Sequence, residues 1–269
     1  MLIGGATLFV AILIGTLMAM RGGDVPATPS AQPANNQPAA QPIKPADAPA
    51  TGTQPSEDAF LAAAEPLTRK FLEARRIDEL LPLVRNPAVV EARMRRLYPD
   101  GKIEAPGMAA FNTQAAILRH GKITSLGVQT RDYQEKSISY VETPRGIKID
   151  WEGWVGWSDM PWQDFLTSKP TTGKVFRVTL SDVDYYNFAF ADDQKWQAYR
   201  LESPDGALAL YGYAERGSTL NGRLRPPPDS PPVPMMLALK FPANATSANQ
   251  VLIEQCLAQG WVEETEPSP

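Results

Sequence analysis

The feature that most constrains this chain is its first twenty residues, which are apolar and carry no charged side chain before Arg21. A helix of roughly 20 apolar residues crosses the ~30 Å hydrocarbon core of a bilayer and satisfies its own backbone hydrogen bonds there. The apolar core of a cleaved signal peptide is shorter, about 7–15 residues, and ends at a small-x-small site, which residues 17–20 lack. The sequence therefore predicts a retained transmembrane anchor over residues 1–21.

The orientation of this anchor depends on the positive charges close to its ends. Arg21 alone lies nearby, on the C-terminal side, and taken literally it favours a cytoplasmic domain. Large domains, however, translocate largely regardless of charge. We expect a single span in the bacterial inner (cytoplasmic) membrane with the following domain in the periplasm, and the cytoplasmic orientation is the alternative.

Residues 22–57 form the next segment, in which eight prolines alternate with Ala, Gln, Asn and Thr and no aromatic residue occurs. Such a segment buries too little apolar surface to offset its ordering entropy. Spaced prolines favour extended polyproline II conformations. The sequence predicts a disordered linker that acts as a spacer, and a proline-rich ligand for a partner is the alternative.

The composition of the remaining chain, about 210 residues, limits its function. This length suits one substantial domain or two small ones. The net charge of −4 argues against nucleic acid as the main partner. Cys256 is the single cysteine and His120 the single histidine, which excludes an intramolecular disulfide and the common zinc spacings. We expect neither a cofactor nor a metal.

The periodicity of the apolar residues changes along the domain. Residues 58–98 have helical spacing, and Pro87 suits the first turn of a helix over 88–98. From about residue 109 the period is two, as in strands, and the predicted meander has strands at 123–130, 136–142 and 147–157. The later elements are helices near 158–166 and 216–224 and strands at 174–180, 185–190, 196–201, 207–213 and 235–241, while 251–262 is ambiguous.

Helices followed by strands predict an α+β domain over 58–265, with helices packed on a curved antiparallel sheet. A division into two subdomains near 158–173 is an alternative. Four local motifs carry a resemblance: Lys148-Ile149-Asp150-Trp151-Glu152, Met160-Pro161-Trp162, Phe176-Arg177-Val178 and Leu210-Tyr211-Gly212-Tyr213. The domain resembles an uncharacterised family of bacterial membrane-anchored envelope proteins and, in element order, the nuclear-transport-factor-2-like (cystatin-like) cone. Its architecture is also similar to the inner-membrane component of type IV secretion systems. These resemblances imply fold and location.

The candidate site residues lie mostly on the predicted strand 147–157. Asp150, Glu152 and Trp154 fall on its polar face, whereas Trp151 and Trp157 fall on its apolar face and are predicted to be core. Two carboxylates at i and i+2 could supply an acid or a base, and two solvated charges are the simpler interpretation. His120 is predicted to be an exposed turn residue without an acidic partner. Cys256 is predicted to be buried.

These patterns assign no catalytic, cofactor-binding or metal-binding residue, and they favour a membrane-tethered binding or scaffolding module of the bacterial envelope. The expected partners are the membrane, through residues 1–20, and a protein of the envelope, with no nucleic acid. Two alternatives remain: an enzyme that uses the concavity of the cone, and a component of an envelope assembly or secretion complex.

Overall fold

The computed structural model describes residues 56–112, 117–227 and 230–264, which lie in the compact unit Thr53–Pro269. These residues form an α+β structure, which confirms the predicted fold class. Within these ranges, none of the helices has the length and apolar character that a membrane crossing requires. The predicted anchor (1–21) and the linker up to residue 55 lie outside the described residues.

The first part of the domain is helical. α1 (Glu57–Glu73) begins where the hydroxyl of Ser56 accepts the backbone N–H of Ala59 at 3.3 Å, and two acidic residues follow in its first turn. α2 (Ile77–Leu80) and the short 3₁₀ helix η1 (Leu81–Leu83) follow. α3 (Pro87–Leu97) starts at the proline that the sequence indicates, because this position needs no N–H donor.

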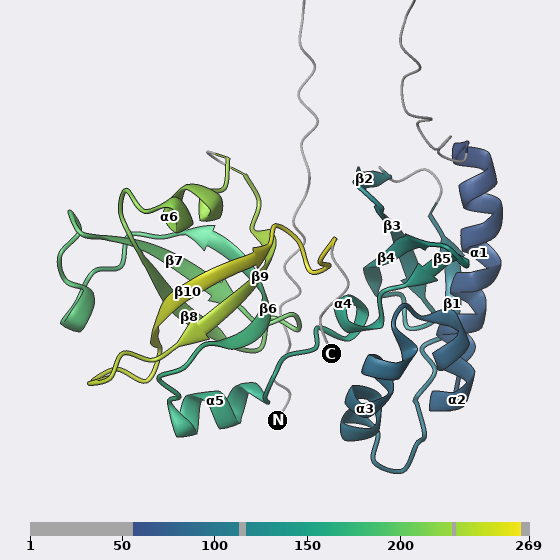
Figure 1. The fold of residues 1–269 in the computed structure, drawn as a ribbon, viewed down its shortest axis with the longest axis horizontal. Helices are drawn as coiled ribbons and strands as arrows, with labels where there is room; N and C mark the ends of the chain where they lie inside the picture. Colours follow the sequence, from purple (N-terminus) through teal and green to yellow (C-terminus); the bar gives the residue numbers. More distant parts are fainter. Residues whose placement is uncertain (1–55, 113–116, 228–229, 265–269) are drawn as a thin grey trace, which may run out of the picture. The chain divides into compact units, whose positions relative to one another are not determined.

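A five-stranded antiparallel sheet comes next. Its strands are β1 (Met108–Phe111), β2 (Leu118–His120), β3 (Ile123–Thr130), β4 (Glu135–Thr143) and β5 (Gly146–Ile149). β3, β4 and β5 form the predicted meander, and β1 and β2 both pair with β3. α1 lies along this sheet (Figure 1). Phe60 of α1 meets the Tyr140 ring edge-on at 5.4 Å, and the Thr68 hydroxyl hydrogen-bonds to the Tyr140 hydroxyl.

The predicted strand 147–157 is wrong beyond residue 149. β5 ends there, and a short helix, α4 (Trp151–Val155), takes the remaining residues. The Asp150 carboxylate caps this helix by accepting the Gly153 N–H at 2.5 Å, and Gly156 ends it with φ 62°. A five-residue helix is too short to display a 3.6-residue period, so its alternating residues resemble a strand.

The second half of the domain contains a closed five-stranded barrel, preceded by α5 (Trp162–Ser168). Its elements are β6 (Lys174–Asp182), the 3₁₀ turn η2 (Phe188–Phe190), β7 (Trp196–Glu202), β8 (Ala209–Glu215), α6 (Thr219–Leu224), β9 (Val233–Lys240) and β10 (Gln250–Ala258). The order around the barrel is β6-β7-β8-β10-β9, and β8 pairs with β10 in parallel. This order, with a helix between the third and fourth strands, is the connectivity of the OB-fold. The described strands therefore form two sheets instead of one curved sheet.

The segment 185–190, predicted as a strand, instead forms a loop and η2 between β6 and β7. Its aromatic rings lie on barrel residues: Tyr185 stacks on Tyr211 and Phe190 on Tyr213, each with ring centroids 3.9 Å apart. The prediction failed because alternating aromatic residues also suit a loop that packs on a sheet face.

Two large hydrophobic cores result. The first lies between the helices and the sheet β1–β5, and the second fills the barrel, where Cys256 is buried as predicted. Phe165 of α5 and Leu224 of α6 contribute to the barrel core, and the two helices lie at opposite ends of the barrel (Figure 1). Both cores belong to the unit Thr53–Pro269, so the predicted division near 158–173 stays a prediction.

Candidate ligand-binding site

The sequence candidates Asp150 and Glu152 are buried, not exposed as their place on a polar strand face predicts. Asp150 lies 2.5 Å from Nε of Arg85, and both side chains are less than a tenth exposed. Glu152 pairs with Arg93 of α3, and its second oxygen lies 3.6 Å from a guanidinium nitrogen of Arg177 on β6. The interpretation as solvated charges is therefore wrong, because α4 turns both carboxylates towards buried arginines.

Arg177 connects this charge cluster to the barrel. Its guanidinium also donates to the backbone carbonyls of Trp157 and Trp261, at 2.8 Å each. Burial lowers the pKa of Arg177, and the carboxylates of Asp150 and Glu152 oppose that shift. Arg85 similarly donates to the carbonyl of Glu263 at 2.8 Å. The cluster thus holds α4, β6 and the C-terminal segment together, and its carboxylates have cationic partners.

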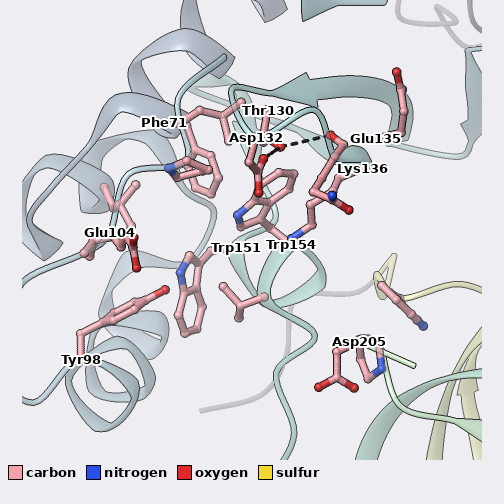
Figure 2. A pocket seen from close by; sticks show the side chains of 18 residues that line it. Phe71, Tyr98, Glu104, Thr130, Asp132, Glu135, Lys136, Trp151, Trp154 and Asp205 are labelled. Carbon is pink, nitrogen blue, oxygen red and sulfur yellow. Dashed lines mark hydrogen bonds between the residues drawn. The ribbon is translucent and has the colours of Figure 1, made fainter. Parts of the chain in front are cut away.

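A cavity of about 610 Å³ lies beside α4, and we call it the aromatic cavity (Figure 2). It is lined by Phe71, Leu72, Leu80, Tyr98, Ile103, Glu104, Pro106, Thr130, Asp132, Gln134, Glu135, Lys136, Trp151, Trp154, Val155, Pro204, Asp205 and Trp261. Trp154 meets Phe71 edge-on at 5.9 Å, and Trp151 meets Tyr98 at 6.4 Å. The cavity lies in the 300–1,000 Å³ range of small-ligand sites.

The charged groups around this cavity are unequal in number. The lining includes four acidic residues, Glu104, Asp132, Glu135 and Asp205, and one lysine, Lys136. The charge of Asp132 acts on the Lys136 ammonium. The Thr130 hydroxyl donates to Asp132 at 2.5 Å, and this hydrogen bond holds the pKa of Asp132 below its ordinary value. Asp132 therefore stays ionised, and the lining favours a cationic group.

Lys136 itself occupies the face of Trp154. Its Nζ lies 4.2 Å from the centroid of the indole ring, and Figure 2 shows its chain reaching down beside that ring. Partial burial lowers the pKa of Lys136, more than the attraction of Asp132 raises it. An ammonium over an indole face is a cation–π contact, so the cavity already has a place for a cation.

A second cavity, of about 520 Å³, adjoins the first, and we call it the serine cavity. It shares Glu135, Lys136, Trp154, Pro204 and Trp261 with the aromatic cavity. Its remaining lining is Leu118, Arg119, His120, Ile123, Ser125, Ser137, Ser139, Gly153, Thr179, Pro234, Gln259, Gly260 and Val262. Two of the serine hydroxyls, of Ser125 and Ser139, are hydrogen-bonded at 2.7 Å.

His120 lies at the serine cavity with its side chain 83% exposed. The exposure agrees with the expectation, but the expected lack of an acidic partner is wrong: Nε2 lies 3.5 Å from the Glu264 carboxylate. This carboxylate is half exposed, so the pair is solvated and not an oriented catalytic dyad. In the ranges that the structure covers, no group of three or more His, Cys, Asp or Glu side chains could hold a metal.

Trp154, the fourth candidate, lines both cavities, but sequence reasoning missed its neighbours. Lys136 looked like an ordinary strand residue, and Tyr98 and Phe71 lie far from it in the chain. One signal in the sequence indicates the helix α4. Asp150 and Gly156 flank its five residues, and these residue types are typical of a helix N-cap and of a left-handed glycine at a helix C-terminus. Comparison with protein-family models, with curated proteins and with solved structures finds no match.

Proposed function

We propose that this protein is a binding module of the bacterial envelope, tethered to the inner membrane by residues 1–21, and that the aromatic cavity holds a cationic group of its ligand. The observation that carries the proposal is a cavity that contains a cation–π contact between Trp154 and Lys136, with Asp132 and three further acidic residues in its lining. Aromatic faces and carboxylates together favour cations, especially where the site is partly desolvated.

An enzyme that uses the same cavity is the alternative. The buried carboxylates that a general acid or base would need, Asp150 and Glu152, lie outside the linings of both cavities and are paired with arginines. The acidic residues that do line the aromatic cavity lie at exposed positions. This arrangement favours binding over catalysis.

The test compares agmatine, which carries a guanidinium, with its uncharged urea analogue, using the full-length chain in mild detergent. Tryptophan fluorescence and titration calorimetry report binding. Cation–π contacts of about 1–2 kcal/mol predict that Trp154→Ala weakens agmatine binding by about 5- to 30-fold.

Trp196→Ala is the matched control, because Trp196 carries a similar contact, with Lys195 Nζ 5.0 Å from its ring, but lies on β7 outside both cavities. This variant should bind agmatine as the parent chain does. Equal binding of agmatine and its urea analogue, or equal losses in the two tryptophan variants, would contradict the proposal.

A further inference from the structure

We infer that the aromatic and serine cavities form one groove for an extended peptide with a basic side chain, and that Lys136 occupies the position over Trp154 that this side chain takes. The inference rests on the proposed function, since it names the ligand of the same cavity. In this arrangement Lys136 does not bind the ligand. It competes with the ligand for the face of Trp154.

The continuity of the groove follows from the shared lining. Five residues belong to both cavities, and two of them, Lys136 and Trp154, are in contact with each other. The cavities therefore meet at this pair. A continuous groove requires the lysine chain to move away from the indole, so that the two cavities join at this pair.

The chemistry changes along the groove. The aromatic cavity has four acidic residues in its lining, whereas the serine cavity is lined by Arg119, His120 and apolar side chains such as Ile123 and Val262. Leu118, in the lining of the serine cavity, is 68% exposed and offers an apolar contact to a ligand. A ligand that matches both ends has a cation at one end and an apolar group at the other.

A peptide meets this requirement better than a neutral glycan does. A basic side chain suits the acidic lining around Asp132, an apolar side chain suits Leu118, and backbone amides suit the hydroxyls of Ser125, Ser137 and Ser139. A neutral glycan can stack on Trp154, but it has no group that the carboxylates attract. The charge complementarity therefore favours a basic segment of a partner protein.

The role of Lys136 follows from the geometry over Trp154. Its ammonium holds the indole face, so a basic ligand side chain must displace it and also meets its like charge. A site that is fractionally occupied by an internal competitor has a weaker apparent affinity for its ligand. Removing the ammonium while keeping an apolar chain should therefore strengthen binding.

The experiment uses a fluorescein-labelled hexapeptide with one arginine and one leucine two positions apart, and the same peptide with citrulline instead of arginine. Fluorescence anisotropy with the full-length chain in mild detergent gives the dissociation constants. Lys136→Met should tighten binding of the arginine peptide by about three- to tenfold. Lys195→Met removes the comparable ammonium over Trp196 and should change nothing.

A second variant tests the extent of the groove. Leu118→Asp changes an exposed side chain, so folding is preserved, and it should weaken the peptide several-fold while leaving agmatine unaffected. Equal effects on both ligands, or none on either, would show that the peptide does not reach the serine cavity. Tighter binding of a neutral chito-oligosaccharide than of the arginine peptide would overturn the peptide assignment.

The outcomes separate the two proposals. If the arginine peptide binds better than the citrulline peptide and depends on Trp154, but Lys136→Met binds it no more tightly than the parent chain, the competitor role of Lys136 is refuted and the cation site stands. If both peptides bind equally and Trp154→Ala has no effect, the proposed function itself fails.

Discussion

Replacing Arg177 by methionine tests the buried charge cluster most directly. Arg177 is 3% exposed, and it is the residue by which β6 contacts Glu152 of α4 and two backbone carbonyls. Methionine keeps much of the apolar volume of the side chain but removes the charge and its donors. In this variant Glu152 keeps its ion pair with Arg93 but loses its contact with Arg177, the more deeply buried of its two cationic partners.

At the 3.6 Å separation of Arg177 and Glu152, a unit charge pair is worth about 4–5 kcal/mol at an effective dielectric of 20. The parent protein bears the free-energy cost of burying the Arg177 charge. The variant does not, which makes its loss of stability smaller. The carbonyls of Trp157 and Trp261 lose their charged donor, which increases it. Variants that break buried pairs lose about 3–5 kcal/mol, and we expect Arg177→Met to fall in this range.

Urea unfolding at neutral pH, followed by tryptophan fluorescence, measures this change. The control is Arg200→Met, which removes a 2.7 Å ion pair with Glu202 at an exposed position of β7 and should cost less than about 1 kcal/mol. A double variant, Arg177→Met with Glu152→Gln, should lose less than the two single losses added together, because the charges no longer oppose each other's burial. Additive losses, or an Arg177→Met loss as small as the control, would refute the reasoning.

Trp151→Ala should cost about 3–5 kcal/mol in urea unfolding and Trp154→Ala clearly less, since Trp151 is buried in the first core whereas Trp154 borders both cavities; equal losses would contradict these environments. Burial raises the pKa of Glu263 in the folded protein, although Arg177 and Arg85 oppose this shift. The protonated side chain therefore favours folding. This stabilisation is fully present below the unfolded pKa and is lost as the pH rises through the folded pKa. Glu263→Gln should therefore raise Tm at pH 7 but not at about pH 3.5, and a shift that is the same at both values would show that the side chain does not titrate differently on folding. For the predicted anchor, the full-length protein should remain in the membrane fraction after an alkaline carbonate wash, and its release as soluble full-length chain would exclude the anchor.

Elements with long local patterns could be predicted from the sequence. β3 (Ile123–Thr130) has the predicted bounds, β4 extends the predicted strand by one residue at each end, and α3 begins at the proline that marks its first turn. In each case eight or more residues carry one period, and a turn or a proline marks the boundary. The burial of Cys256 and Trp151 likewise follows from their chemistry, whichever element carries them.

The candidate site depended on contacts that no local pattern contains. The alternation of residues in 147–157 suits a strand and a capped short helix equally. In the helical form, the carboxylates of Asp150 and Glu152 pair with Arg85, Arg93 and Arg177, which lie 25 to 65 residues away in the chain. Segment 185–190 lies as a loop on the rings of Tyr211 and Tyr213 for the same reason. Likewise, the barrel closes through the parallel pairing of β8 with β10, two strands that are separated by α6 and β9. A period in the sequence reports which side of an element is apolar, whereas the partner that covers that side is chosen by packing and charge pairing between distant segments.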